Sequence, residues 1–441
     1  MKTKIKKWGI NGEGIAYSHK KTIFVDHAIP GEVVDIEIVE DLPKYSNAEV
    51  KEVIEPSPRR RMHPICPKWE SCGGCSIVHV DYKGQVRMKE QVLKEALRKY
   101  ANYEGKVEPI IKNPEPLGYR NACKLPFGHV NGKICTGMYK KGSNEFVAVD
   151  RCLIHSKKLE KVRIELMDIF AQYDLPVAAN AKQSGLLALV LKEFDEQVHV
   201  TFVSGQMNIP QELVDQILAL EDVVSVWQSI KDEDVADYEL FGKTVTHLGG
   251  QEQLSLKLAD YQLNLLPKSF FQLNTKQAIT LYQTIATWIP EHSHFLVEAY
   301  SGVGAISLFV ADHADQVVGI EYIADAVDNA NTNAKLNGKD NVSFICGDAG
   351  EEMEKLIAKQ SIDTLIVDPP RSGLNKKMKD SILKSLPESL IYVSCNPATL
   401  GKDLKDLQRA YEIKRVQPFD FFSQTAHVET AVLLSRRKSK K

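Results

Sequence analysis

The C-terminal part of the chain alternates apolar strand-like segments with helical ones, and this alternation is the strongest constraint on the fold. From residue 295 onward the strand-like segments are FLVEAY, QVVGIEY, VSFICGD, DTLIVDPP, SLIYVSC, EIKRVQPF and ETAVLLSR. Continuous apolar strands that alternate with helices are typical of a doubly wound, mostly parallel sheet with helices on both faces. Ligands of such sheets bind at the carboxyl ends of the strands. We therefore expect an α/β protein whose functional residues lie at those strand ends in a C-terminal domain, residues 266–441.

The first 265 residues have a different pattern. Residues 1–58 contain the short strand-like segments KTIFVD, EVVDIEIVE and NAEVKEVIE, which are separated by turn signals. Several short strands at this spacing predict a small β-barrel. Residues 59–265 mix strand-like and helical segments, and apolar residues recur at helical spacing over about 82–100. We expect a mixed α+β central domain whose helix at 82–100 packs on the C-terminal domain.

The bulk properties of the chain exclude some classes of protein. A chain of 441 residues with 43% hydrophobic residues can bury more than one core. It has no run of about 18 apolar residues, and its N-terminus lacks the apolar stretch of an export signal, so we expect a cytoplasmic monomer without a membrane partner. Its eight cysteines are then expected to stay reduced, as candidates for catalysis or metal binding.

A glycine-containing turn follows the first strand of the C-terminal domain. In SGVGAIS, Gly302 and Gly304 open a helix, where they let a backbone approach a ligand closely. Glu321 ends the second strand and Asp348 the third, while Glu298 precedes the turn. Acidic residues at consecutive strand ends suit the ribose, adenine and ammonium of S-adenosylmethionine better than a pyrophosphate. The alternative is that these carboxylates only cap the following helices.

The fourth and fifth strands end in two further motifs. Asp368 begins the stretch DPPR, in which Arg371 stands where adenine N6-methyltransferases have an aromatic residue. This substitution removes the stacking ring that an adenine substrate needs. The fifth strand ends in SCNP, which places the Cys395 thiol at the edge of the sheet that carries the glycine turn. Taken alone, a cysteine at a strand end is more often a core residue than a nucleophile.

The chemistry of uracil gives such a thiol a specific role. C5 of uracil does not attack a methyl sulfonium directly, so a nucleophile must first add to C6. A thiolate at Cys395 suits this addition and can leave again afterwards. A base must also remove the C5 proton. Glu429 in HVETAV is the best candidate, because a strand returning beside the fifth would place its carboxylate near Cys395.

Together these motifs resemble the RNA 5-methyluridine methyltransferase family. The resemblance rests on SGVG, DPPRSG, SCNP and HVET, and the first 56 residues look like a TRAM domain, a small RNA-binding β-barrel. It implies a Rossmann-like methyltransferase domain that uses S-adenosylmethionine, with Cys395 as nucleophile and Glu429 as base. Phe270 and Phe271 are candidates for stacking on a flipped base, although core packing is their commoner role. The implied cofactor-binding positions are Gln272, Tyr300, Glu321 and Asp368.

Four other cysteines are similar to the ligands of a [4Fe-4S] cluster in that family. They are Cys66, Cys72 and Cys75, spaced C-x5-C-x2-C, and the distant Cys152 in DRCLIH. Four thiolates also suit a zinc ion, and spacing alone does not separate the two. We expect a structural or RNA-positioning role. A radical enzyme would need a C-x3-C-x2-C arrangement, which the chain lacks.

The family resemblance is compatible with more than one RNA substrate, and two other functions compete with uridine methylation. Members that act on 23S ribosomal RNA tend to have both a TRAM domain and cluster cysteines, so we expect 23S rRNA as the partner and tRNA as the alternative. A second function is a non-catalytic RNA-binding assembly factor, for which Cys395 and Glu429 would be dispensable. A third is cytidine C5 methylation, but its usual Thr-Cys and Pro-Cys dipeptides are absent.

Overall fold

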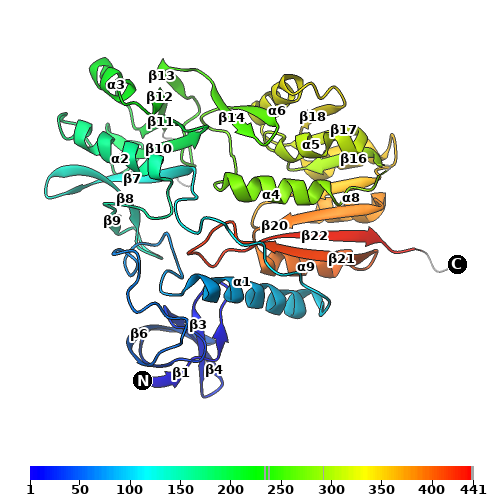
Figure 1. Cartoon of the computed structure of the whole chain (residues 1–441), viewed down its shortest axis with the longest axis horizontal. Helices are drawn as coiled ribbons and strands as arrows, with labels where there is room; N and C mark the ends of the chain where they lie inside the picture. The colour runs from blue at the N-terminus through cyan, green and yellow to red at the C-terminus, as the bar shows by residue number, and fades with distance from the viewer. Residues whose placement is uncertain (233–234, 237–238, 292, 439–441) are drawn as a thin grey trace.

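The computed structural model describes residues 1–441 except 233–234, 237–238, 292 and 439–441, and it contains three main sheets (Figure 1). The C-terminal sheet has the strand order β18-β17-β16-β19-β20-β22-β21. The first five of these strands are parallel, and β22 runs antiparallel to both neighbours. The strands are β16 Ser293–Ala299, β17 Ala314–Glu321, β18 Val342–Cys346, β19 Thr364–Val367, β20 Ser389–Ser394, β21 Tyr411–Phe419 and β22 Glu429–Arg436.

Helices cover both faces of this sheet, which confirms the doubly wound α/β prediction. One face packs on α4 (Thr275–Ala286), α5 (Ala305–Val310) and α6 (Ala324–Leu336), and the other on α7 (Ala349–Ile357), α8 (Lys376–Ser385) and α9 (Pro397–Leu407). Two hydrophobic clusters result, one for each face. The strand order reverses between β16 and β19, and ligands of doubly wound sheets bind at such a point.

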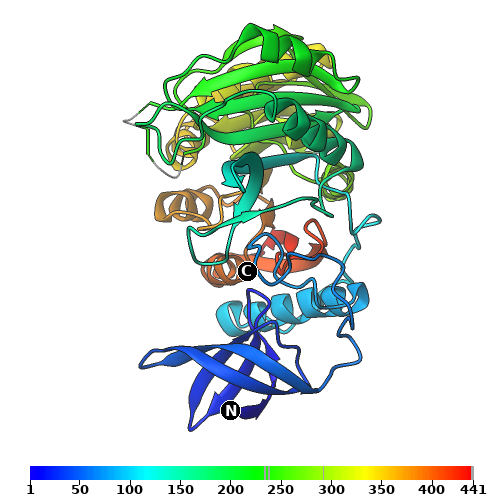
Figure 2. The ribbon, with the colours of Figure 1, turned by 90° about the vertical axis from the view of Figure 1, so that its left-hand side faces the viewer.

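Helix α1 (Tyr82–Ala96) comes from the N-terminal half but packs on the C-terminal domain. It continues into a π-helical turn, Leu97–Ala101, and Leu93 and Leu97 belong to the same hydrophobic cluster as α7, α8 and α9. A Cβ at Gly401 of α9 would lie 2.8 Å from Tyr100 Cβ, so glycine allows the two elements to approach closely. Figures 1 and 2 show α1 between the N-terminal strands and the C-terminal sheet.

The N-terminal strands form a six-stranded sheet with the order β1-β5-β6-β4-β3-β2. The expected closed barrel is not found: β1 and β2 are the two edge strands, and no pairing between them joins the edges within the described chain. They are successive pieces of one segment, in which Ile5 N–H donates to Glu32 O and Lys6 N–H to Ile15 O. β1 therefore pairs with β5 at one edge of the sheet, and β2 pairs with β3 at the other edge. The strands are β1 Lys2–Lys4, β2 Lys7–Trp8, β3 Gly14–Ser18, β4 Lys21–Asp26, β5 Val33–Asp41 and β6 Tyr45–Glu55.

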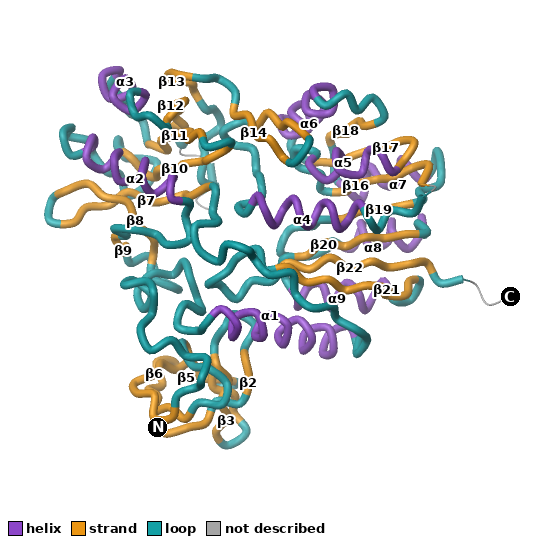
Figure 3. The backbone as a smooth tube through the Cα atoms, viewed as in Figure 1, coloured by secondary structure: helices purple, strands orange, loops and turns teal. Residues whose placement is uncertain are grey.

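The central region is built on a third sheet with the order β13-β12-β11-β10-β7-β8-β9, in which β11 and β12 are parallel and the other pairs antiparallel. Helices α2 (Lys157–Phe170) and α3 (Gln211–Leu218) pack on it, and the hairpin of β14 (Leu254–Leu258) and β15 (Tyr261–Leu265) leads to α4. Figure 3 shows loops where the three sheets meet. The strands are β7 Ala122–Val130, β8 Lys133–Tyr139, β9 Phe146–Ala148, β10 Leu186–Phe194, β11 Gln197–Ser204, β12 Val223–Ile230 and β13 Thr246–Gly250.

Among the described residues, no helix combines the length and the apolar character that a membrane span requires.

Candidate active site

The turn after β16 is held in an unusual backbone conformation. Tyr300, Gly302 and Gly304 all have positive φ, at 68°, 53° and 81°. A Cβ at Gly304 would lie 2.4 Å from the Phe344 ring, so this position requires glycine. A Cβ at Gly302 would meet no atom within 4 Å, which leaves its backbone open to a ligand. The turn therefore combines a packed glycine with an open one.

The acidic residues around this turn have different environments. Glu321, at the end of β17, accepts hydrogen bonds from Gly302 N–H at 2.9 Å and Ile323 N–H at 3.0 Å. Asp348 accepts from Glu351 N–H at 3.1 Å, so it caps α7 as the alternative explanation expected. Glu298 is buried, and burial raises its pKa to about 8, while Ser307 donates a hydrogen bond to it. Glu298 thus bonds to the helix that follows the turn, whereas Glu321 fixes the backbone of the turn itself.

Cys395 and Glu429 lie across from each other at the end of two paired strands. β20 and β22 are antiparallel, and Ser394 pairs with Thr430. Cys395 follows Ser394 and Glu429 precedes Thr430, so both side chains come from the next position along the ladder. Cys395 is half-buried, whereas Glu429 is only 4% exposed.

The acidic groups at this edge raise one another's pKa. Burial, Glu429 and Asp368 raise the pKa of the Cys395 thiol to about 11, and Arg371 opposes the shift. Burial followed by the Asp368 charge raises the pKa of Glu429 well above its usual range. Burial raises the pKa of Asp368 to about 7. Like charges this close cannot all ionise together, so the site holds protons at neutral pH.

The Arg371 backbone is fixed by the residues that follow Cys395. Its carbonyl accepts hydrogen bonds from Asn396 Nδ2 and Thr399 Oγ1, both at 3.2 Å. Asn396 also caps α9 by accepting from Ala398 N–H at 3.0 Å, and Pro397 occupies the first turn, where its missing N–H costs nothing. DPPR and SCNP therefore form one structural unit. From the sequence, Arg371 indicated only a missing aromatic ring, whereas in the structure its charge lowers the pKa of both the Cys395 thiol and Glu429.

The loop before α4 carries Gln272 and the two phenylalanines. Asn121 Nδ2 from the central region donates to Gln272 O at 3.0 Å, and Asn274 Nδ2 donates to Phe421 O at 3.0 Å, which anchors both ends of this stretch. Phe271 is 7% exposed, as core packing requires, but Phe270 is 70% exposed.

A buried ion pair that the sequence analysis missed supports the strand that carries Glu429. Lys89 of α1 is fully buried, and its ammonium contacts the Asp420 carboxylate and donates to Phe422 O at 3.0 Å. Tyr82 Oη also donates to Asp420, at 2.8 Å. The pair fixes the loop that leads into β22. Since 331 residues separate the two partners, no local pattern could reveal it.

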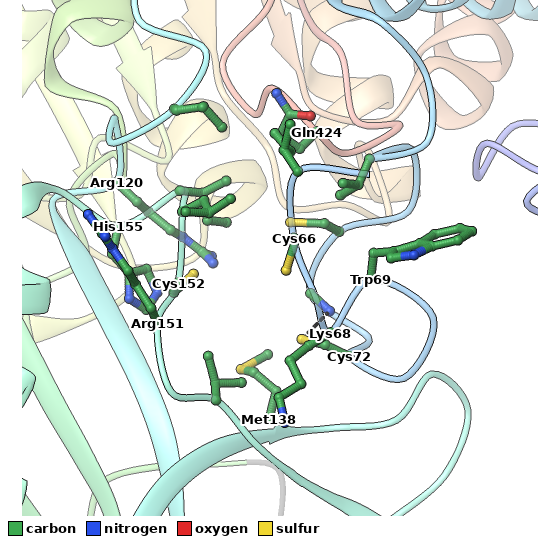
Figure 4. Close-up of a pocket in the computed structure, with 18 of the residues that line it drawn as sticks. Cys66, Lys68, Trp69, Cys72, Arg120, Met138, Arg151, Cys152, His155 and Gln424 are labelled. Carbon is green, nitrogen blue, oxygen red and sulfur yellow. Dashed lines mark hydrogen bonds between the residues drawn. The ribbon is translucent and has the colours of Figure 1, made fainter. Parts of the chain in front are cut away.

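The four remaining candidate cysteines line one cavity of about 50 Å³ (Figure 4). Cys66, Cys72 and Cys75 lie on the loop between β6 and α1, and Cys152, which lies between β9 and α2, is on the other side of the cavity from Cys66 and Cys72. Burial and the neighbouring thiols raise the pKa of Cys75 to about 12. Across the part of the chain that the structure describes, no three His, Cys, Asp or Glu side chains are placed to hold one metal ion. The metal centre therefore stays a prediction.

Comparison with known sequences identifies the family. The tRNA (uracil-5-)-methyltransferase family matches residues 81–437, and the TRAM domain matches residues 3–51. A protein of Enterococcus faecalis named "uncharacterized RNA methyltransferase" is 35% identical to this chain, and the alignment covers 98% of this chain and 97% of that protein. A Bacillus cereus protein of the same name is 34% identical, with 98% and 96% covered.

A solved structure extends this likeness to the whole fold. The Pyrococcus abyssi tRNA (uracil-54, C5)-methyltransferase in complex with S-adenosyl-L-homocysteine aligns with a TM-score of 0.78 and 26% identity, over 98% of this chain and 99% of that one. The neighbour's ligand is what S-adenosylmethionine becomes after methyl transfer. The chain belongs to the tRNA (uracil-5-)-methyltransferase family, whose members methylate C5 of uracil in RNA with S-adenosylmethionine.

Proposed function

We propose that this protein methylates C5 of a uridine in RNA with Cys395 as the nucleophile and Glu429 as the base. The observation that carries the proposal is the position of the two side chains, one step beyond the Ser394–Thr430 pair on antiparallel strands. A thiol and a carboxyl group opposite each other are the two groups that the reaction needs.

The proposed reaction consists of addition to C6, methyl transfer to C5 and elimination. The Cys395 thiolate adds to C6 of uracil, which turns C5 into an enolate carbon. Bound S-adenosylmethionine supplies an electrophilic methyl group, and C5 takes it. Glu429 in its ionised form then removes the C5 proton, and the electron pair of that C–H bond forms the C5–C6 double bond. The C6–S bond breaks and the thiolate of Cys395 is restored.

The protonation of the resting site shapes this sequence. Burial raises the pKa of Glu429 well above its usual range and the pKa of Cys395 to about 11. Cys395 must therefore lose its proton before it adds to C6, and Glu429 acts as a base only in its ionised form. Arg371 favours both ionisations, because its positive charge lowers the pKa of each group. We assign Arg371 the role of an electrostatic positioning residue.

We place the cofactor at the strand ends beside Cys395. The open backbone at Gly302 and the Glu321 carboxylate suit the ribose and amino acid portions of S-adenosylmethionine. Burial and then the charge of Asp348 raise the pKa of Tyr300 to about 12. The proposed cofactor-binding residues are Gln272, Tyr300, Gly302, Gly304, Glu321, Asp348 and Asp368.

Covalent trapping tests the nucleophile. RNA that contains 5-fluorouridine has no C5 proton to lose, so the adduct with Cys395 cannot be resolved after methyl transfer. We expect a protein–RNA complex that survives denaturation, and mass spectrometry should find the nucleotide on the peptide that contains Cys395. Attachment to another residue would contradict the assignment.

The RNA substrate has two candidates, 23S ribosomal RNA and tRNA. A TRAM-like region together with the four cysteines supports 23S rRNA by family resemblance. The Pyrococcus abyssi neighbour is a tRNA enzyme that matches this chain over nearly its full length, which favours tRNA equally. Mapping 5-methyluridine in separated rRNA and tRNA from cells with and without the gene decides between them. The fraction that loses the modification contains the substrate.

We also propose a [4Fe-4S] cluster at the four cysteines. Support comes from the common cavity and from the cations Lys68, Arg120 and Arg151 in its lining, which suit a thiolate-bound cluster. Four thiolates would also hold a zinc ion, so the test must distinguish the two metals. Visible absorption with iron and sulfide analysis of protein purified without oxygen tests the proposal. Stoichiometric zinc would overturn it.

The domain boundaries follow from these assignments. We propose residues 1–58 as a TRAM-like RNA-binding region, 59–265 as a central RNA-binding domain and 266–441 as the methyltransferase domain. The exposed Phe270 lies where the last two meet, because Asn121 of the central region bonds the backbone of the neighbouring Gln272.

A further inference from the structure

A second cavity, of about 300 Å³, lies between the central sheet and the loop that carries Phe270. One wall comes from β7 and β10 and the other from residues 268–273. Its volume is within the range of small-ligand pockets. The basic residues in its lining are Arg120, Lys124, Lys192 and Lys268, and Phe241 and Phe270 are two of its aromatic residues.

The lining of this cavity is basic, and it includes no Asp or Glu among the described residues. Lys192 is only 7% exposed, and its Nζ donates to Ser269 O at 2.7 Å. Lys124 Nζ lies 5.8 Å from the centroid of the Phe241 ring. Burial and then Lys124 lower the pKa of Lys192 to about 7. Cations that crowd in this way without a carboxylate cost stability, and an anion bound among them would remove that cost.

Aromatic rings accompany the positive charge. Phe270 exposes 70% of its surface on the loop next to Gln272, whereas its neighbour Phe271 is buried. Proteins that bind single-stranded nucleic acid combine exposed aromatic rings with nearby cations, because each base has a face that can stack. The cavity thus combines groups for a phosphate with a ring for a base.

The cavity adjoins the loop that carries the cofactor-binding candidate Gln272. Asn121 lines it and donates through Nδ2 to Gln272 O at 3.0 Å. Arg120 lines it as well, and its charge acts with that of Arg371 on His427, whose pKa burial and these cations lower to about 4. His427 stands two residues before Glu429. The cavity is therefore next to the Gln272 loop, and the charge of Arg120 acts on the segment that leads to Glu429.

We propose that this cavity binds a nucleotide of the same RNA strand next to the target uridine, with its phosphate on Lys124 and Lys268 and its base against Phe270. The proposal rests on the RNA substrate proposed above. It adds a binding site for an unmodified nucleotide, so that affinity for RNA and the register of the target base depend on residues outside the reacting centre.

Binding of a fluorescein-labelled single-stranded oligoribonucleotide tests the proposal without methyl transfer. Lys124→Gln should lower the slope of log affinity against log salt by about 0.7, the value for one phosphate contact with a single strand. Phe270→Ala should weaken binding at least about fivefold and leave that slope unchanged. Lys133→Gln is the matched control, because Lys133 is exposed on the adjacent β8 and does not line the cavity. Equal effects of Lys124→Gln and Lys133→Gln would overturn the proposal.

Amine acetylation of the unmutated protein gives a second measurement that no folding defect can affect. The oligoribonucleotide should protect Lys124 and leave Lys133 reactive. Inorganic phosphate at the same phosphate concentration should protect neither lysine. Equal protection of Lys124 by inorganic phosphate would mean a general anion site and would overturn the nucleotide assignment.

The same experiments separate this proposal from the proposed function. If the oligoribonucleotide protects Lys124 but RNA gains no 5-methyluridine, the methylation fails and the cavity stands. If RNA is methylated and Lys124 stays fully reactive in the complex, the cavity assignment fails alone.

Discussion

The protein places thiols in two contrasting settings. Cys395 lies at a strand end, opposite Glu429 and within the field of Asp368 and Arg371. Cys66, Cys72, Cys75 and Cys152 lie on loops around a small cavity whose lining also includes Lys68, Arg120, Arg151 and His155. Burial raises the pKa of both Cys395 and Cys75. The difference lies in the partners: an arginine and carboxyl groups act on Cys395, whereas burial and the other three thiols contribute most to the shift at Cys75.

The largest expected effect is on the rate of methyl transfer by Cys395→Ala. We expect the rate to fall by about 10⁴-fold or more, because the addition to C6 has no other nucleophile. Thermal unfolding should change little, since Cys395 is only half-buried. The measurements are transfer of a labelled methyl group and the unfolding temperature. Full activity in the alanine variant would show that Cys395 is not the nucleophile, and its thiol would then differ from the other four only in location.

Glu429→Gln should have the next largest effect. Glutamine cannot remove the C5 proton, so release of the product should slow by about 10²–10⁴-fold, the usual range for loss of a general base. The methylated nucleotide should stay attached to Cys395 and appear as a retarded band in a denaturing gel. Release at the normal rate would assign the proton transfer to another group.

The pH dependence should show the raised pKa of Cys395. A thiol with a pKa of about 11 is mostly protonated at pH 7, so the thiolate fraction increases about tenfold for each pH unit below that pKa. The rate of adduct formation should therefore rise from pH 7 to pH 9. Arg371→Gln removes the charge that lowers this pKa, so its profile should move to higher pH, whereas Arg371→Lys should keep most of the original position. Identical profiles for the glutamine variant and the unmutated protein would contradict the role of Arg371.

Cys75→Ser should have the smallest effect on the chemical step. Glu429, Arg371 and Asp368, which act on Cys395, do not line the four-cysteine cavity. Substitutions at the two groups of thiols should therefore act independently. We expect loss of the visible absorption of the cluster and a lower unfolding temperature, with kcat within about threefold of normal. A loss of kcat as large as that of Cys395→Ala would show that the two groups of thiols act together.

The sequence allowed prediction of the features that strand periodicity controls. Parallel strands gather their carboxyl ends at one edge, so the motifs that end in Cys395 and Asp368 could be placed together from their order in the chain. The prediction of a closed barrel was wrong because pairing at the sheet edges depends on how the segment around Ile5 bends. Phe270 and Phe271 are adjacent and alike in chemistry, and only the tertiary structure makes one exposed and the other buried. Lys89 and Asp420 could not be paired from any local pattern.

The ion pair between Lys89 and Asp420 also determines how the protein can be divided. A fragment that starts at residue 266 would contain Asp420 but not the lysine that neutralises it, and it would leave one face of the C-terminal sheet without α1. A ribosome releases Lys89 long before Asp420, so the helix must wait for nearly the whole chain before its charge is compensated. A fragment expressed for catalysis must therefore include α1 together with its capping residue Asp81, where the match to the methyltransferase family also begins.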